Sequence, residues 1–424
     1  MPVLVAPPEK VSHIADDLFR RESSRLVAIL TGIFGAGNLQ LAEDVVQEAL
    51  VRALQTWPYH GIPQNPPAWL MQTARNLALD VVRREKRFRD KHATIVETFE
   101  HRTAPAPAPG LTGELGDDQL RLLFTCCHPV LTHDDQVALS LKTLCGFSAT
   151  EIANGFFATE AAILKRLTRA RKKLASEHVT FEIPDRDELP ARLDAVHRIL
   201  YLFFNEGYKA SAGAGLVRSE LCDEAIRLAD LLPQNPATNT PTTHALLSLM
   251  LLHHARAASR TSMDGNLMLL CKQDRGLWNR DLIRRGILHL DKSAQGDEVS
   301  EYHFQAGIAA QHCLADSIEA TDWDRILMLY DYWLHANPSP VIALNRAVAV
   351  SYTNGPAAAI DEVMAVCDQD EIKGYYLVEA LLGDFHARLG QPDRARKHYA
   401  QAAYLAANET EKHFLQKQAD TLQE

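Results

Sequence analysis

Residues 146–174, GFSATEIANGFFATEAAILKRLTRARKKL, hold the pattern that decides how this chain is built. Ser148 and Glu151 are spaced as a capping box, which predicts that a first helix begins there. Thr159 predicts the cap of a second helix. The apolar positions of that helix recur at helical spacing and are Ile163, Leu167, Ala170 and Leu174. Its other face is basic, with six Lys and Arg against the single acidic residue Glu160. The sequence therefore predicts a helix-turn-helix, whose second helix lies in the major groove of DNA. The alternative is a solvated charged face on an ordinary core helix.

Length and composition indicate a folded, multidomain chain. At 424 residues and 46% hydrophobic content, two to four packed domains are expected. No apolar run reaches the length of a membrane span, and MPVLVAPPEK at the N-terminus lacks a signal-peptide pattern. The seven cysteines are scattered and odd in number, which fits reduced thiols. We therefore expect a cytoplasmic protein without a membrane partner.

One cysteine cluster resembles a metal site at first sight. Cys126, Cys127 and His128 are adjacent, but they lack the spacing of zinc ligands, so small buried residues are the better interpretation. Elsewhere the sequence offers no nucleophile–base motif and no phosphate-binding glycine loop. We expect no catalytic residues, no metal and no cofactor.

Charge is distributed unevenly along the chain, whose net charge is −10. Residues 1–175 hold 21 Lys and Arg against 19 Asp and Glu, whereas residues 291–424 hold 10 against 21. Only charges within about a Debye length of a phosphate affect its binding. The acidic C-terminal part therefore does not exclude nucleic acid as a partner of the front half.

Linkers and periodicity divide the chain into helical parts. The alternating Ala and Pro of residues 103–110 predict an extended linker, and FEIPDRDEL at 181–189 marks a second boundary. Beyond it, helices are expected over 192–205, 216–232, 244–259 and 277–290. Strand-like alternation is almost absent, so the fold class is all-α. Gly355 and Gly390 lie 35 residues apart, each before an Ala-rich helix, which favours tetratricopeptide-like (TPR-like) repeats near the C-terminus.

The front half carries a second pattern. Residues 42–57, AEDVVQEALVRALQTW, predict an amphipathic helix. The side chains expected to face its core are Val45, Val46, Ala49, Leu50, Ala53, Leu54 and Trp57. A second helix, from residue 67, leads into a basic cluster over 83–89. Aromatic rings beside cations are typical of single-stranded DNA binding, although Trp57 and Trp69 are more simply explained as core residues.

These motifs together resemble the extracytoplasmic-function (ECF) sigma factors of bacterial RNA polymerase. AEDVVQEAL resembles region 2.2, PAWLMQTARNLALDVVRR regions 2.3 and 2.4, and the stretch 146–174 region 4.2. The resemblance implies that Asp44, Gln47 and Glu48 contact the clamp helices of the largest polymerase subunit. It implies a −10 element interface at Arg75, Asn76, Asp80, Arg83 and Arg84. It also implies a −35 element interface at Thr159, Glu160, Lys165, Arg166, Arg169 and Lys172.

The remaining residues resemble a subgroup that carries a long C-terminal TPR-like extension. The implied domains are region 2 over 1–100, the linker over 101–112, region 4 over 113–178, and the extension over 179–424, TPR-like from about residue 320. Its candidate regulatory residues are Asp264, Gln273, Asp274, Arg275, Asn345 and Arg346. They either cap helices and pair carboxylates between repeats, or line a groove for a peptide, for the sigma domains themselves or for a regulatory protein.

The sequence as a whole predicts a non-enzymatic sigma factor. Its partners would be core RNA polymerase, through the clamp helices and the flap, and promoter DNA, both duplex and melted. One alternative is a stand-alone helix-turn-helix regulator, which would leave the helix of residues 42–57 without a role. The other is a TPR-type scaffold or an enzyme built on the helical array. An enzyme would need a cluster of catalytic side chains, and the sequence does not offer one.

Overall fold

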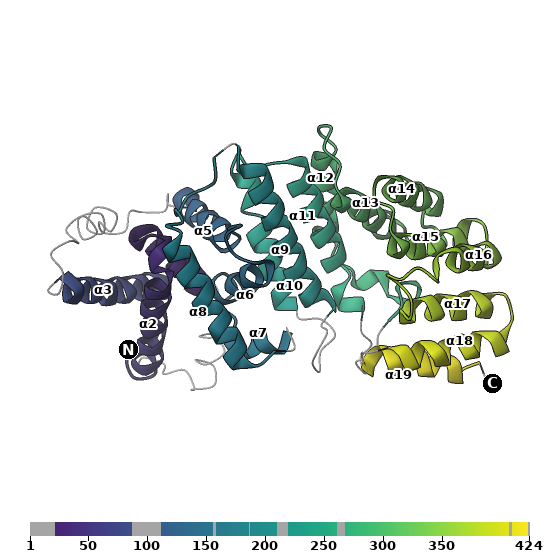
Figure 1. The fold of residues 1–424 in the computed structure, drawn as a ribbon, viewed down its shortest axis with the longest axis horizontal. Helices are drawn as coiled ribbons and strands as arrows, with labels where there is room; N and C mark the ends of the chain where they lie inside the picture. Colours follow the sequence, from purple (N-terminus) through teal and green to yellow (C-terminus); the bar gives the residue numbers. More distant parts are fainter. Residues whose placement is uncertain are drawn as a thin grey trace. The chain divides into compact units, whose positions relative to one another are not determined.

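The computed structural model describes residues 22–86, 112–155, 158–185, 187–209, 219–260, 268–406 and 409–422. Over these ranges every regular element is a helix and none is a strand, which confirms the all-α prediction (Figure 1). The chain forms two compact units. Unit 1 comprises residues 1–203 and 227–238, and unit 2 comprises 204–226 and 239–424. The predicted linker over 101–112 lies almost wholly outside the described residues.

The front of unit 1 is a small helical bundle. A helical stretch over 22–34 leads through η1 (Ala36–Asn38) into α2 (Leu39–His60), on which α3 (Pro66–Lys86) packs. The buried stripe of α2 runs through Ala42, Val46, Ala49, Ala53 and Trp57 at helical spacing. Leu54 was expected in this core, and that prediction is wrong, because it is 48% exposed. It lies one residue beyond Ala53 and hence about 100° around the helix from the stripe.

The second part of unit 1 contains four helices and the start of a fifth. They are α5 (Thr112–Cys126), α6 (His133–Thr143), α7 (Ala149–Gly155), α8 (Glu160–Ser176) and α9 (Leu189–Lys209). The predicted capping box is present: the Ser148 amide donates to Glu151 Oε2 (2.8 Å), and the Glu151 amide donates to Ser148 Oγ (3.1 Å). Thr159 Oγ1 accepts from the Ala162 amide, so both helices begin where the sequence predicts.

Unit 2 is a succession of helices that pack on their neighbours in the sequence (Figure 1). Its helices are α10 (Ser219–Ala229, whose last turn belongs to unit 1), α11 (Pro241–His254), α12 (Arg280–Ser293), α13 (Glu301–Leu314), α14 (Trp323–Ala336), α15 (Pro340–Thr353), α16 (Pro356–Val366), α17 (Tyr376–Arg388), α18 (Pro392–Leu405) and α19 (Glu409–Asp420). Two predicted bounds need correction. The helix expected over 244–259 ends at His254, before a 3-10 turn, and the one expected from residue 277 begins at Arg280, where Asn279 caps it.

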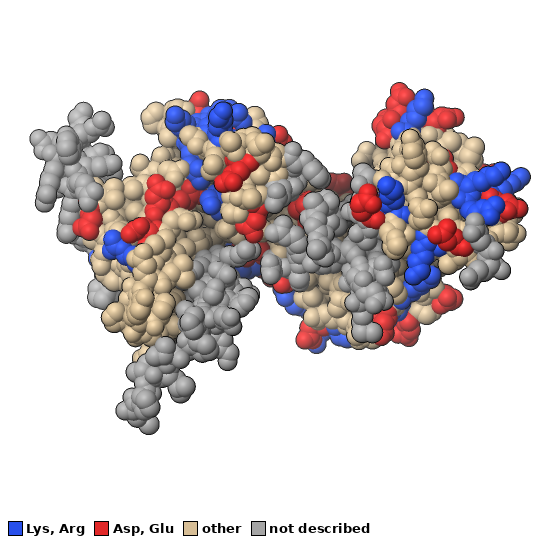
Figure 2. Space-filling model, turned by 90° about the horizontal axis from the view of Figure 1, so that it is seen from below, with Lys and Arg blue, Asp and Glu red and all other residues tan. Residues whose placement is uncertain are grey.

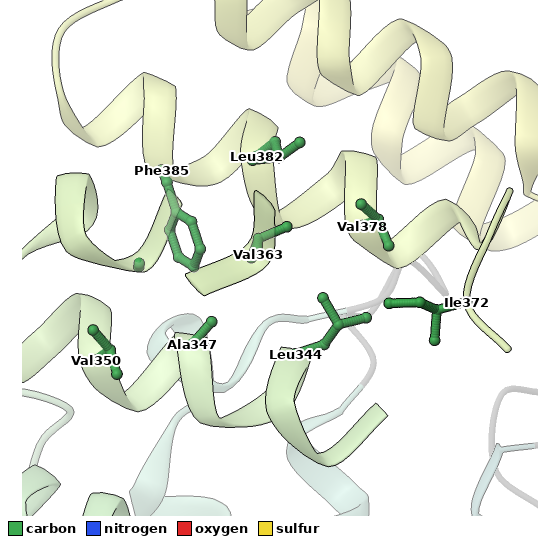
Figure 3. Packing of buried hydrophobic residues seen from close by; sticks show 9 residues of the cluster. Leu344, Ala347, Val350, Val363, Ile372, Val378, Leu382 and Phe385 are labelled. Atoms are coloured by element: carbon green, nitrogen blue, oxygen red, sulfur yellow. The ribbon is translucent and has the colours of Figure 1, made fainter. Parts of the chain in front are cut away.

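Apolar side chains from successive helices form the core of the last part of unit 2. Leu344, Ala347 and Val350 of α15 face Val363 of α16 and Phe385 of α17 (Figure 3). Figure 3 shows these side chains pointing into the space between the three helices, where each is at least 95% buried.

A glycine sets the spacing between α17 and α18. A Cβ built on Gly383 would lie 2.9 Å from the ring of Tyr399, so the ring fills the position of the missing side chain. The absence of a side chain at this position therefore lets the ring pack closely between the two helices.

Candidate functional site

One face of α2 carries a row of open polar side chains. Asp44, Gln47 and Glu48, the predicted polymerase-contacting residues, are all exposed. Asp44 Oδ1 accepts from Gln40 Nε2 (2.7 Å), and Glu48 Oε1 lies 3.1 Å from Arg52 Nε. Both partners are on α2 itself, and such exposed pairs contribute little stability. These side chains can therefore leave their partners on α2 and contact another molecule with little loss of folding stability.

The α3 helix places the predicted −10 residues in different environments. Asn76 and Asp80 are exposed and Arg75 is half-buried; Asn76 Oδ1 accepts from Gln72 Nε2 (3.1 Å). Arg83 and Arg84 fall within α3, but their side chains lie outside the described residues, as does the rest of the basic cluster.

The aromatic side chains near α3 divide between core and surface. Trp57 is 4% exposed and its ring meets Trp69 edge-on, with 5.6 Å between ring centroids. The core interpretation of Trp57 is thereby confirmed. Tyr59, in contrast, is 84% exposed and is the ring in this group open to stacking by an unpaired base.

The α8 helix separates an apolar from a basic face as predicted. Ile163, Leu167, Ala170 and Leu174 are at most 1% exposed. Among the predicted −35 residues, those exposed are Thr159, Glu160, Lys165, Arg169 and Lys172, whereas Arg166 is half-buried. The basic face is therefore open along most of the helix.

Two carboxylates at the start of α6 hold two of these arginines, which the sequence did not predict. Arg166 Nη1 lies 2.8 Å from Asp134 Oδ2, and Arg169 Nη2 lies 2.6 Å from Asp135 Oδ1. The Asp135 side chain is only 3% exposed, and its hydrogen bond raises the pKa of Arg169. Asp134 and Asp135 also lie in the first turn of α6, where carboxylates stabilise the start of a helix. Lys165 and Lys172 appear in none of these ion pairs.

The cysteine cluster is a buried structural element. Cys126 and Cys127 have no exposed surface, and burial raises the pKa of Cys127 to about 12. His128 Nδ1 accepts from the Val130 amide (3.2 Å), so it stabilises the turn before α6. Such thiols remain protonated and unreactive at neutral pH. No group of three or more potential metal ligands lies together in the part of the chain that the structure describes.

The predicted residues of the C-terminal extension mostly bind neighbouring backbone or acids. Asp274 Oδ1 accepts from the Gly276 amide (2.8 Å), as expected for a cap. Arg275 was expected to pair a carboxylate, and that prediction is wrong. Its guanidinium donates to the carbonyls of His312 and Ala315, because these free acceptors lie at the C-terminal end of α13.

The other candidate regulatory residues of the C-terminal extension have different surroundings. Arg346 pairs with Asp331 (2.7 Å) and Glu362 (2.8 Å), and so links α14, α15 and α16. Gln273 Oε1 accepts from a serine hydroxyl, Asn345 is exposed, and Asp264 lies outside the described residues.

Acidic and basic side chains are intermixed on the face of the molecule shown in Figure 2. Binding to a polyanion would therefore depend on local groups such as the open face of α8 rather than on net charge. Among the helices that the structure describes, none combines the length and apolar character that a bilayer span requires.

Two family descriptions match the chain. Sigma-70 region 2 matches residues 18–88, and a family of unknown function, DUF6596, matches residues 192–294. No solved structure matches the chain.

Three curated relatives are similar to it. The "Uncharacterized protein R00370" of Rhizobium meliloti is 40% identical over 388 residues, covering 91% of this chain and 90% of that protein. The ECF RNA polymerase sigma factor EcfG of Rhodopseudomonas palustris is 31% identical over 142 residues, 33% of this chain and 73% of that protein. The ECF RNA polymerase sigma factor SigL of Mycobacterium tuberculosis is 31% identical over 139 residues, 32% of this chain and 75% of that protein. Because the chain covers about three quarters of both sigma factors, it belongs, through its N-terminal third, to the family of ECF RNA polymerase sigma factors.

Proposed function

We propose that the chain is a sigma factor that binds core RNA polymerase and directs it to particular promoters. The observation that carries this proposal is the match of residues 18–88 to Sigma-70 region 2, together with the open acidic row of α2 inside it. Asp44, Gln47 and Glu48 would contact the clamp helices of the largest subunit. Such rim charges steer association and set its specificity.

In this proposal α3 serves the −10 element. Arg75, Asn76 and Asp80 would read melted bases, and Arg83 and Arg84 would hold phosphates. The open ring of Tyr59 adds a surface on which an unpaired base can stack.

The α7–α8 pair would be the helix-turn-helix of region 4, docked at the polymerase flap and on the duplex −35 element. Thr159 and Glu160 begin the recognition helix, Lys165 and Arg166 would reach base edges, and the cations farther along α8 would hold phosphates. Asp134 and Asp135 would then fix the direction in which Arg166 and Arg169 point.

The C-terminal extension, from about residue 179 and TPR-like from about 320, would govern activity. It would pack on the sigma regions or receive a regulatory protein; the acidic balance of residues 291–424, opposite in sign to the basic face of α8, supports this role. A chain ending after Thr238 keeps all of unit 1 and should differ strongly from the full chain in promoter output. Equal output from the two folded chains would contradict a regulatory role.

Binding of the full chain to core RNA polymerase, followed by transcription from a promoter library, tests the sigma function. The Asp44→Lys/Glu48→Lys chain should lose core binding. The matched control, Glu182→Lys/Asp187→Lys, reverses two exposed acids elsewhere in unit 1 and should bind like the parent. A chain that ignores polymerase but binds duplex DNA unaided would instead be a stand-alone regulator.

A further inference from the structure

A side chain from the proposed extension completes the end of α5. Arg192, in the first turn of α9, is 8% exposed and is the first residue that the DUF6596 description matches. Its Nη2 donates to the carbonyl of Phe124 (2.8 Å), 68 residues earlier in the chain. Its guanidinium carbon also lies 6.0 Å from the centre of the Phe124 ring. A residue of the extension is therefore in direct contact with the helices proposed as region 4, inside unit 1.

The Phe124 carbonyl accepts from Arg192 because α5 ends at this point. In a continuing α-helix, the amide four residues later donates to each carbonyl. That amide belongs to His128, and it donates instead to the carbonyl of Thr125 (3.2 Å). A carbonyl left over at a helix end needs another donor, and a basic side chain can supply it. Arg192 thus caps α5 from a different helix.

The capping bond is the main polar support of this guanidinium. Arg192 Nη1 lies 3.7 Å from a carboxylate oxygen of Glu188, but that side chain is 71% exposed, and such pairs contribute little. Burial lowers the pKa of Arg192, so the cation is costly to keep in this position. A hydrogen bond from a charged donor offsets more of that cost than a bond from a neutral donor. The position of α9 is therefore tied to the backbone at the end of α5, and not only to apolar packing.

The capped turn leads to the carboxylates that hold the arginines of α8. Gln136 of α6 is 7% exposed, and its Nε2 donates to the carbonyls of Cys127 (3.1 Å) and His128 (3.0 Å). The residue before it is Asp135, whose carboxylate lies 2.6 Å from Arg169 Nη2. Side chains thus connect the end of α5 to the start of α6, and the start of α6 to α8. Such a series of buried hydrogen bonds can carry a shift from one end to the other.

From these contacts we infer that the extension supplies a positioning residue to the proposed −35 interface: Arg192 sets the direction of the α8 arginines through the start of α6. The effect on DNA rests on the proposed function, whereas the cap itself concerns the free chain alone. A second arginine of the extension acts on the same helix, because Arg227 Nη1 of α10 donates to Gln119 Oε1 of α5 (3.3 Å). The extension would therefore govern −35 binding through its first helix, without covering the face that binds DNA. Since α9 runs on into unit 2 beyond Phe203, a partner that displaces α9 there would release the cap.

Amide exchange of the full chain, measured by mass spectrometry, tests the cap. Arg192→Gln removes the charged donor and should speed exchange in the last turn of α5 and the first turn of α6 at least about tenfold. Arg192→Lys keeps a cation and should restore part of the protection. The matched control is Arg198→Gln, which removes an exposed arginine from the same helix and should leave both turns unchanged. Equal exchange in Arg192→Gln and in this control would overturn the inference.

The salt dependence of duplex binding tests the positioning role, because a loss of stability alone leaves the number of phosphate contacts unchanged. Arg192→Gln should release Arg169 as Asp135→Asn does. Between 50 and 200 mM salt, its affinity should therefore fall by about 3.5-fold more than that of the parent. When Asp135→Asn is already present, adding Arg192→Gln should not change the salt dependence further, since the same arginine is already released.

Two results of the binding experiment would also overturn the inference. One is an Arg192→Gln chain with the salt dependence of the parent, and the other is a double variant in which the two single effects simply multiply. If the parent and all variants fail to bind duplex DNA, the proposed function fails. The exchange rates then still decide whether Arg192 holds the end of α5.

Discussion

The two carboxylates of α6 provide a direct test of how α8 binds DNA. Asp135→Asn keeps the shape of the side chain but removes the charge that holds Arg169 Nη2 at 2.6 Å. Arg166 keeps its 2.8 Å contact with Asp134, so the single change releases one cation and Asp134→Asn/Asp135→Asn releases two. If these arginines face DNA, each one released becomes available to a phosphate.

The expected effect appears in the salt dependence of binding. Each additional phosphate contact steepens the plot of log affinity against log salt by about 0.9. Between 50 and 200 mM salt, a fourfold change, the affinity of Asp135→Asn should therefore fall by about 3.5-fold more than that of the parent, and that of the double variant by about 12-fold more.

Fluorescence anisotropy of the full chain with a labelled duplex measures both slopes. Asp118→Asn, which releases Arg121 on α5 in the same unit, is the matched control. Slopes equal to those of the control would mean that Arg166 and Arg169 do not reach phosphates. A shallower slope would mean that the acids are needed to aim the arginines, and either result would refute the reasoning.

Three further changes test the packing. Gly383→Ala places a methyl group 2.9 Å from the Tyr399 ring. The overpacking should cost about 1–3 kcal/mol of folding stability, against about 1 kcal/mol gained in helix propensity. Amide exchange in α17 and α18 should therefore accelerate, and the second change Tyr399→Leu should reverse this acceleration. Burial lowers the pKa of His197 to about 3 in the folded chain. On acidification below about pH 6.5, the unfolded chain therefore binds a proton at His197 while the folded chain does not. The free energy of unfolding should fall by about 2 kcal/mol at pH 5 as a result. Urea midpoints at pH 7 and pH 5 should therefore diverge less for His197→Gln, and equal divergence would exclude this histidine as the cause. Thr159→Ala should cost about 1 kcal/mol and speed amide exchange in the first turn of α8, whereas unchanged exchange would show that the cap is dispensable.

Local features of the fold were predictable because they depend on neighbours in the sequence. The capping box at Ser148 and the buried stripe of α8 follow from side-chain spacing over three or four residues. Leu54 was misplaced because the apolar residues of α2 outnumber the positions that its core can bury.

The distant pairings could not be read from the same spacing. Arg166 and Arg169 look like free cations in the sequence, and their partners at the start of α6 lie more than 30 residues earlier. Glu43 and its neighbour Asp44 both carry carboxylates, but they point about 100° apart on α2, and this direction decides which one faces Arg171 and which one faces solvent. Arg275 could have paired with any nearby acid, and only the tertiary position of α13 supplies the carbonyls that it binds.

The order in which the chain visits its two compact units limits how such a protein can arise or be divided. The polypeptide leaves unit 1 after Phe203, returns at Arg227 within α10, and leaves again after Thr238. No single cut therefore releases both units whole, and a simple end-to-end gene fusion does not produce this interleaving. The match to DUF6596 over residues 192–294 spans all of these crossings, so that family's segment includes residues of both units. Exchange of the extension between relatives would have to carry part of unit 1 with it, and chimaeras joined at residue 192 should fold better than those joined at residue 239.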